Sequence, residues 1–168
     1  MTVTIRRLVE DDIEAVLAVA LAAWEPVFPS LSGILGPEIW RRLDEDHVGS
    51  QHKAIVELCR DSSGTSQVWV AEVAGDVPGR PVLAGFVASK LDFASKRGEI
   101  WFLAVHPDFQ NQEIGTQLSL HALDRMREAG MTLAIVETGG DPSHAPARRA
   151  YEKAGFTGLP IVRYFQVL

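Results

Sequence analysis

The stretch EIWFLAVHPDFQNQEIGT, residues 99–116, carries the strongest structural pattern in this chain. Its first part, Ile100–Val105, is an unbroken apolar run typical of a buried strand. A polar turn, His106–Glu113, comes next, and a helix is expected from there to about Ala129. The first amides of a helix have no partners within the helix, so this strand-turn-helix arrangement directs N–H groups at one point. The stretch therefore predicts an anion-binding site.

The helix that begins in this stretch has a clear apolar stripe. Its members recur at helical spacing and end before Gly130, a residue that commonly ends helices. They are Ile114, Leu118, His121, Ala122, Met126 and Ala129. Met131–Glu137 is then a continuous apolar strand, Thr138–His144 a loop and Pro146–Ala154 a helix with Gly155 after it. Ile161–Leu168 is expected to form a last strand.

Upstream of residue 99 the pattern predicts three strands in succession. These are Val68–Ala74, Val82–Leu91 and the strand of the opening stretch, separated by turns at Gly75–Pro81 and Asp92–Gly98. Short turns rich in Gly and Pro between strands favour an antiparallel meander.

The N-terminal part is expected to be mostly helical. Thr2–Arg7 resembles a short strand, and Asp11-x-x-Glu14 resembles a capping box. The helix that follows has apolar residues at Ile13, Val16, Leu17, Ala20, Leu21 and Trp24. Residues 25–37 contain three prolines and two glycines and are expected to form a loop. Further helical segments are predicted at Glu38–Leu43 and Gln51–Cys59.

Together these elements predict one α/β (α+β) domain over residues 1–168, in the order β-α-α-β-β-β-α-β-α-β. A mixed, mostly antiparallel sheet with flanking helices is expected. The composition, 46% apolar and 23% charged, is ordinary for a globular protein. The net charge of −6 disfavours nucleic acid and mildly favours cationic partners such as amines.

Several function classes are disfavoured by what the sequence lacks. A single cysteine, Cys59, excludes a disulfide within the chain and a cysteine metal cluster. The five histidines share no metal-ligand spacing, so no metal site is expected. No leader-like start and no apolar run of membrane-spanning length are evident, so a cytoplasmic protein without membrane contact is expected.

Two motifs resemble one known family. Gln110-x-x-Glu113-Ile114-Gly115 resembles the Q/R-x-x-G-x-G/A pyrophosphate loop of the GCN5-related N-acetyltransferases, the GNAT family. The segment Pro146–Phe156 is similar to that family's N-x-x-A-x-x-L-Y-x-K-x-G-F helix. The residues in register are Ala147, Tyr151, Lys153, Gly155 and Phe156. The resemblance implies the GNAT fold and acetyl-coenzyme A (acetyl-CoA) as co-substrate.

The resemblance also implies which residues contact the coenzyme. Leu103–Val105 would offer backbone groups to the pantetheine arm, and the Val105 N–H would polarise the thioester carbonyl. His144 stands where the family commonly has Asn. The full implied set is Leu103, Ala104, Val105, Gln110, Asn111, Gln112, Glu113, Ile114, Gly115, Thr116, His144 and Tyr151.

Two residues are candidates for proton transfer. Glu99 begins the strand where several family members place a base, and alternation would put Glu99, Trp101 and Leu103 on one face. The alternative is a solvated residue at the start of a strand. Tyr151 matches the family's general acid, and the alternative is a core tyrosine with its hydroxyl at the rim. Direct transfer to a primary amine in a ternary complex is the expected reaction.

Two loop residues depart from the family pattern. Gln112 stands where Arg or Lys often contacts phosphate, and Glu113 replaces a glycine. A carboxylate there would repel a diphosphate within about 10 Å. These departures keep open a non-catalytic GNAT module that binds acyl-CoA or a protein. A nucleotide-binding loop at Gly139-Gly140 is a weaker alternative, because no Gly-Lys-Ser/Thr follows.

The acceptor is the least determined part of the prediction. A small molecule or a peptide amine would fit, and a homodimer is compatible with the family. Trp24 and Trp40 flank residues 25–37, Phe28 lies within them, and all three are expected to be core residues or walls of an acceptor cleft. Arg148 and Arg149 could approach phosphates or form a solvated face.

Overall fold

The computed structural model describes residues 2–43, 47–75 and 79–168, so part of the expected turn at Gly75–Pro81 lies outside the described residues. A five-stranded sheet lies at its centre in the order β1-β2-β3-β4-β5. The strands are β1 (Val3–Arg7), β2 (Ser66–Ala74), β3 (Pro81–Asp92), β4 (Arg97–Val105) and β5 (Leu133–Val136). Neighbours from β1 to β4 pair antiparallel and β5 lies parallel to β4, so the predicted meander is confirmed.

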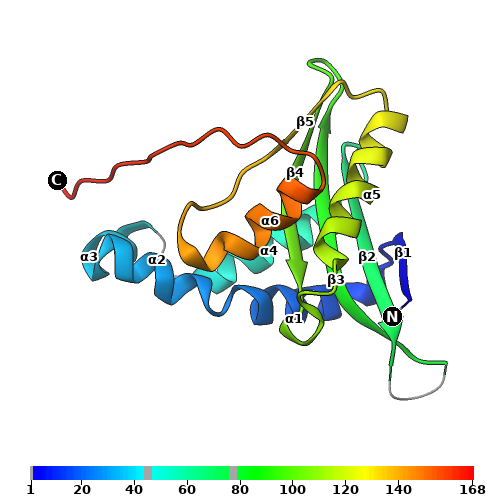
Figure 1. Ribbon diagram of the computed structural model, residues 1–168, viewed down its shortest axis with the longest axis horizontal. Coiled ribbons are helices and arrows are strands. Elements are labelled where there is room, and N and C mark those ends of the chain that lie inside the picture. Colours follow the sequence, from blue (N-terminus) through cyan, green and yellow to red (C-terminus); the bar gives the residue numbers. More distant parts are fainter. Residues whose placement is uncertain (1, 44–46, 76–78) are drawn as a thin grey trace.

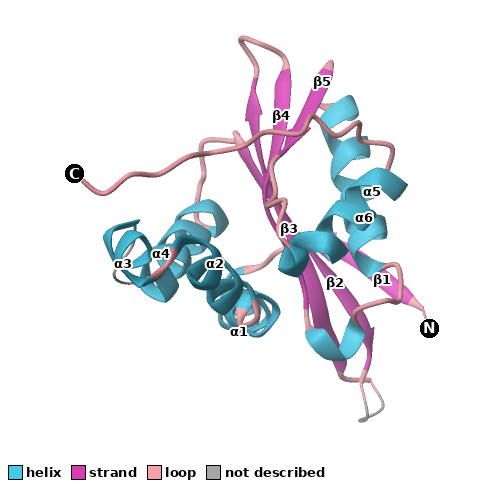
Figure 2. Cartoon of the chain, turned by 60° about the vertical axis from the view of Figure 1, so that its left-hand side comes forward, coloured by secondary structure: helices cyan, strands magenta, loops and turns pink. Residues whose placement is uncertain are grey.

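Helices cover both faces of the sheet (Figures 1 and 2). They are α1 (Ile13–Trp24), α2 (Val27–Leu35), α3 (Pro37–Leu43), α4 (His47–Cys59), α5 (Ile114–Glu128) and α6 (Ala145–Lys153). Figure 2 shows α1 to α4 on one side of the sheet and α5 on the other, with α6 beside α5. Within the described ranges no single helix could span a membrane, though the bent pair Glu10–Trp24 and Val27–Leu35 meets that test of length and composition.

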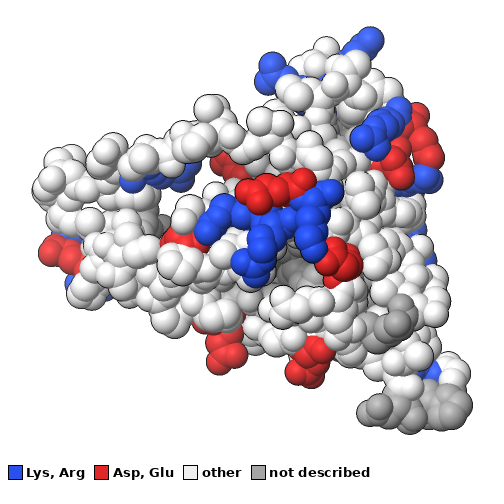
Figure 3. Space-filling model, in the orientation of Figure 1, with Lys and Arg blue, Asp and Glu red and all other residues white. Residues whose placement is uncertain are grey.

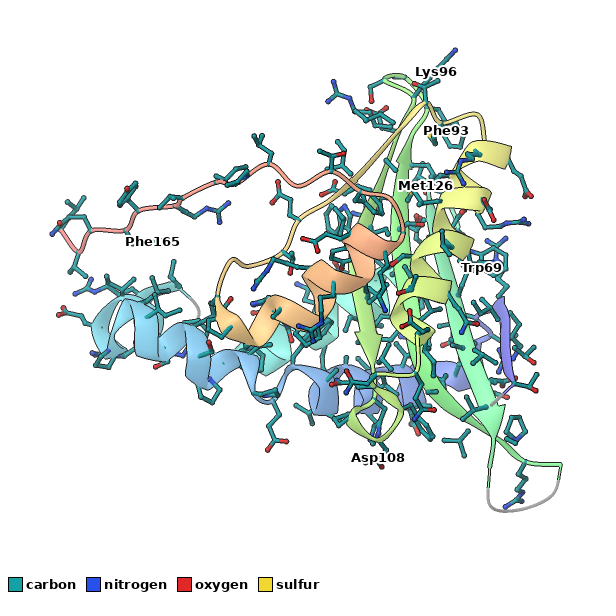
Figure 4. All side chains as sticks on the ribbon, in the orientation of Figure 1. Trp69, Phe93, Lys96, Asp108, Met126 and Phe165 are labelled. Carbon is teal, nitrogen blue, oxygen red and sulfur yellow. The ribbon has the colours of Figure 1, made fainter. Side chains whose placement is uncertain are left out.

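Helix α5 packs on one face of the sheet through the predicted stripe. Ile114, Leu118, Ala122 and Met126 are buried there against strand residues such as Val87. Figure 4 shows Met126 between α5 and the sheet. A Cβ on Gly98 would lie 2.5 Å from the Met126 Sδ, so glycine lets the helix approach β4 closely.

Helix α1 packs on the opposite face, together with α4. Val16, Val19 and Ala20 of α1 form a second buried cluster with sheet residues Phe86 and Ala104. The two clusters lie on opposite sides of the same strands, because successive strand residues point to opposite faces. Residues on this α1 face therefore look towards the N-terminal helices.

A bulge in β4 changes the expected face of Glu99. Ala88 pairs with Phe102 and Ser89 pairs with Ile100, which leaves Trp101 as the extra residue. An extra residue inverts the alternation on either side of a bulge. Leu103 packs in the α5 cluster and Phe102 in the α1 cluster. Glu99 thus shares the α1 face with Phe102, and the expectation that it shares a face with Leu103 is wrong.

Residues 25–37 form a helix rather than the expected loop. Pro26 precedes α2 and Pro29 lies in its first turn, where backbone N–H groups have no partners within the helix. Gly36 ends the helix with φ 77°, and Pro37 begins α3. The prolines and Gly36 therefore lie at helix ends, although the number of prolines and glycines alone suggested a loop.

The expected strand at Ile161–Leu168 is absent. The segment after α6 runs as an extended chain away from the sheet (Figure 1). Apolar side chains such as Tyr164 and Leu168 are exposed there, because the segment pairs with no strand that would bury them. Its end, with Phe165 labelled in Figure 4, approaches α3 and lines a small cavity of about 200 Å³ with Ile39. β-prone composition alone does not supply a partner strand.

Candidate active site

Strands β4 and β5 separate at the centre of the site. They pair only from Arg97–Leu133 to Ile100–Val136. Further along β4, the His106 N–H donates to the Ala84 carbonyl at 2.8 Å. Hydrogen-bonding direction alternates along an antiparallel strand, so the Val105 N–H points away from β3 into the gap. The expected splay beside Val105 is therefore present.

The turn between β4 and α5 is tightly wound. Asn111 and Glu113 adopt left-handed conformations, with φ 59° and 63°. The side-chain amide of Gln110 donates to the Val105 backbone carbonyl at 3.1 Å and holds the turn against the strand. Helix α5 begins at Ile114, so its free amides lie at the end of this turn. Glu113 occupies a conformation that favours glycine, the residue that the family pattern has there.

A cavity of about 480 Å³ opens where the strand, the turn and four helices, α1, α2, α5 and α6, meet. Ten of the twelve residues expected to contact the coenzyme line it: Leu103, Ala104, Val105, Gln110, Asn111, Glu113, Ile114, Gly115, Thr116 and His144. Gln112 and Tyr151 do not line it. The side-chain amide of Gln112 instead donates to the Asp108 backbone carbonyl at 3.4 Å. The sequence thus identified most of one side of the cavity.

The other lining residues come from segments that the motifs did not single out as coenzyme contacts. They are Ala23, Trp24, Pro26, Val27, Phe109, Pro142, Ser143, Pro146, Ala147, Arg149, Ala150 and Lys153. Trp24 packs against Phe86 and Phe102, with ring centroids 6.5 and 5.6 Å apart. Phe28 and Trp40 pack on each other at 6.3 Å and do not line the cavity.

Helix α6 brings positive charge to the cavity. Lys and Arg side chains gather over α6 beside a hollow in the surface (Figure 3), and the helix carries Arg148, Arg149 and Lys153. Arg149 and Lys153 line the cavity, whereas Arg148 donates to the carbonyls of Gly139 and Asp141 at 2.5 and 2.8 Å. Cations that the turn lacks are thus supplied by the helix opposite it.

Glu113 is paired with one of these cations. Its carboxylate accepts a hydrogen bond from the Lys153 ammonium, and this contact lowers the pKa of Glu113. Both side chains are about half exposed, so the pair is also screened by water. The repulsion expected between Glu113 and a diphosphate is therefore countered locally by Lys153.

Tyr151 lies on α6 but is buried beneath the cavity wall. Its ring packs edge-on against Phe156, with centroids 5.9 Å apart. Burial raises the pKa of Tyr151 to about 12, so the phenol stays protonated at neutral pH. The hydroxyl is consequently a hydrogen-bond donor and a weak acid.

Glu99 does not line the cavity. It lies opposite Lys90 on β3 and Ile135 on β5. At about 3.3 Å per residue it stands roughly 13 Å along β4 from Leu103, a lining residue. Lys90 turns its ammonium over the ring of Trp101, 3.6 Å from the centroid. The structure therefore does not bring Glu99 and Tyr151 together in one cavity.

The sequence did not predict a functional role for the polar cluster that follows β5. Asp141 is buried and accepts hydrogen bonds from the Ser143 amide at 3.1 Å and the Ser30 hydroxyl at 2.9 Å. It also contacts the Ser143 hydroxyl and the His144 Nδ1. The i, i+3 spacing of Asp141 and His144 was visible, but nothing in it showed that Ser30 joins them.

Comparison with known proteins agrees with this geometry. The chain matches the acetyltransferase (GNAT) family over residues 32–156. It is 42% identical over 64 residues to a mycothiol acetyltransferase of Sanguibacter keddieii, a match that covers 38% of this chain and only 20% of that protein.

Solved structures share the whole fold at low sequence identity. A GNAT-family protein from Desulfovibrio desulfuricans is 22% identical with a TM-score of 0.67, covering 96% of this chain and 89% of that one. The PaiA N-acetyltransferase of Thermoplasma acidophilum, solved with coenzyme A, is 23% identical with a TM-score of 0.65, covering 94% and 91%. With the family match over three quarters of its length, this chain belongs to the GNAT acetyltransferase family.

Proposed function

We propose that the protein transfers an acetyl group from acetyl-CoA directly to a primary amine. The observation that supports this most is the shared cavity. The free Val105 N–H and the start of α5 open into the same space as Trp24 and Val27 of the N-terminal helices. One side can hold an acyl-CoA, and the other leaves room for an acceptor.

We assign protein groups in the cavity to the diphosphate, the pantetheine arm and the thioester of the coenzyme. The amides at the start of α5, with Arg149 and Lys153 opposite, would hold the diphosphate. Leu103 and Val105 would offer backbone groups to the pantetheine arm in the gap between β4 and β5. The Val105 N–H then donates to the thioester oxygen as negative charge develops on it.

A covalent relay through the protein has no support in the described residues. Cys59 lies at the end of α4 and does not line the cavity. Burial raises the pKa of its thiol to about 11, so the reactive thiolate is scarce at neutral pH. Attack by the amine on the bound thioester is therefore the proposed route.

Tyr151 is the proposed donor to the departing sulfur. With a pKa of about 12 its proton is held too tightly for easy transfer to a thiolate, whose thiol ordinarily titrates near 8.5. A hydrogen bond from the phenol would still stabilise the thiolate. The acid role expected from the motif is thus proposed here as hydrogen-bond donation.

Glu99 is the base that the sequence analysis predicts for taking the proton from the acceptor amine. From the α1 face of β4, outside the cavity, it could receive a proton only through intervening water. Replacing Glu99 by Gln tests this role. Lower turnover with unchanged coenzyme binding would support Glu99, whereas wild-type turnover would exclude it.

The proposed function is tested by two measurements on the full chain. Thermal unfolding is followed with acetyl-CoA, coenzyme A and ATP, and stabilisation by the first two alone is expected. Release of free thiol is then measured across cationic small molecules, amino acids, peptide N-termini and lysine peptides. Thiol release that depends on one amine class supports transfer. Stabilisation without release from any class would indicate the non-catalytic binding module instead.

A further inference from the structure

We propose that His144, oriented by Asp141, takes the proton from the acceptor amine in place of Glu99 and then passes it to the departing sulfur. This inference rests on the proposed acetyl transfer. It assigns to the two residues roles beyond the coenzyme contact that the sequence suggested for His144. The geometry of the cluster, its location in the cavity and the glycine beneath it all support these roles.

The cluster fixes which nitrogen of His144 carries the proton. Burial alone would raise the pKa of Asp141, but hydrogen bonds from Ser143, Ser30 and His144 outweigh it and hold that pKa well below its usual range. Asp141 is therefore ionised and can only accept. The His144 nitrogen that contacts it, Nδ1, must be the donor. In the neutral ring the Nε2 is then left with a free lone pair, the form that a base requires.

His144 is also in the right part of the cavity. It lines the same space as Leu103–Val105 and as Trp24, so it borders the cavity proposed to hold both the thioester and an acceptor. The ring is about one-fifth exposed, and its Nε2 has no hydrogen-bond partner among the described residues. By contrast, Glu99 does not line this space.

The absence of a side chain at Gly139 leaves room for the contact between Asp141 and His144. A Cβ on Gly139 would lie 2.5 Å from the Asp141 Oδ1 and 2.6 Å from the His144 Nδ1. Any other residue there would push the two groups apart. The neighbouring Gly140 has nothing within 4 Å of such a Cβ. The two glycines thus provide a matched pair of positions, one that touches the cluster and one that does not.

Asp141 also links the two halves of the cavity. Ser30 belongs to α2, on the acceptor side, and donates to the same carboxylate that orients His144. Arg148 of α6 donates to the Asp141 backbone carbonyl, which fixes the loop from the other side. The carboxylate is thereby held rigidly, as a positioning residue must be.

The proposed proton path balances within the cavity. The neutral amine attacks the thioester carbon and the N–C bond forms. His144 Nε2 takes the proton from that nitrogen, and Asp141 stabilises the resulting imidazolium. As the C–S bond breaks, the sulfur leaves with the bonding electron pair and receives the proton from Nε2. The products are the acetylated amine, free coenzyme A thiol and neutral His144.

Other charged groups lie around the cavity that the pair lines. From α6, Arg148 contacts the Asp141 backbone, and Arg149 and Lys153 line the cavity. From the β4–α5 turn, Glu113 lines it as well, paired with Lys153. Among these charged groups the Asp141 carboxylate is the one in direct contact with the ring, so we expect its replacement to affect proton transfer most.

The main test replaces His144 by Asn, the residue common in the family, and Asp141 by Asn. We expect His144→Asn to lower kcat about 100-fold, the usual size of a general-base contribution, with the KM for acetyl-CoA within about threefold. The acidic limb of the kcat–pH profile should disappear in His144→Asn. In Asp141→Asn kcat should also fall, because the ring loses the carboxylate that orients it. A purely structural role would change thermal stability and leave the surviving pH profile unmoved.

Two further measurements keep the proposal testable if these variants fold poorly. Gly139→Ala should lower kcat at least tenfold by displacing His144, whereas Gly140→Ala should retain wild-type kcat. In the free protein, ¹H–¹⁵N NMR should show the Nδ1-protonated tautomer of His144, altered in Asp141→Asn. Wild-type kcat in His144→Asn, with loss of turnover in Glu99→Gln, would overturn the proposal. Absence of amine-dependent thiol release in the wild type would instead overturn the proposed function itself, and this role with it.

Discussion

The two walls of the cavity do different chemical work. The wall from Leu103 to Thr116 offers mainly backbone groups, namely the free Val105 amide and the start of α5. The wall from Pro142 to Lys153 offers side chains, namely His144, Arg149 and Lys153. A strand-turn-helix segment can bind a phosphate with neutral residues, because amides and the helix dipole supply the positive potential. Charge and proton transfer then have to come from the opposite wall.

The difference explains how this chain tolerates its unusual turn. Gln112 provides no cation and Glu113 adds a negative charge, yet Lys153 on the other wall pairs with that carboxylate. If the cavity binds the coenzyme as proposed, this pairing compensates across the cavity for the negative charge of the turn. The walls should therefore be tested separately as well as together.

The largest expected effect comes from closing the backbone wall. A Cβ on Gly115 would make ordinary contacts, 3.5 Å from the Ala150 Cβ and 3.7 Å from Leu103. Gly115→Leu extends beyond these contacts into the cavity and should weaken acetyl-CoA binding about 100-fold, or about 2.7 kcal/mol. Gly115→Ala, measured alongside by calorimetry, should weaken it less than tenfold. Equal affinities in the leucine variant and the wild type would show that the coenzyme does not pass Gly115.

The next effect concerns Tyr151, which is buried beneath the side-chain wall. Tyr151→Phe removes a hydroxyl whose pKa of about 12 keeps it protonated throughout the neutral range. We expect kcat to fall about tenfold, the loss of one hydrogen bond to a charged sulfur, without change in coenzyme affinity. Below pH 11 the size of this loss should not vary with pH. A loss that grows between pH 7 and 9 would contradict a phenol that titrates near 12.

The smallest effect is expected at Glu113. Because Lys153 already neutralises this carboxylate, Glu113→Gln should tighten coenzyme A binding by no more than about threefold at low salt. Glu113→Gly should do the same and also raise Tm by about 2–4 °C, since glycine adopts the left-handed conformation without strain. Thermal unfolding separates the two variants. A tenfold or greater gain in affinity would mean that Lys153 does not offset the carboxylate.

The fold could be predicted best where local pattern and burial agree. The meander, the α5 stripe and the α6 boundaries follow from apolar spacing and from Gly and Pro at element ends. Residues 25–37 were wrongly predicted to form a loop, because prolines near helix starts and glycines near helix ends give the segment a composition typical of loops. The strand expected at Ile161–Leu168 failed for a different reason: a strand also needs a neighbour with free hydrogen-bonding groups, and the local sequence does not specify one.

The candidate site shows the same difference between features set by local sequence and features set by long-range contacts. Ten residues of the expected coenzyme set line one cavity, and contiguous motifs had brought them together in the prediction. The bulge at Trp101, which moves Glu99 to the α1 face, depends on pairing with β3 and has no local signature. The Ser30–Asp141–His144 cluster joins residues more than a hundred positions apart, so only the folded chain reveals it.

The most direct test of the two-wall account is a calorimetric titration of coenzyme A into the wild type and into Arg149→Met/Lys153→Met. A control of equal charge change, Arg125→Met/Arg127→Met, alters the far end of α5. We expect one site per chain, an affinity about 10- to 100-fold weaker in the α6 double variant, and a smaller salt dependence there than in the wild type or the control. Equal affinity and equal salt dependence in all three proteins would contradict it.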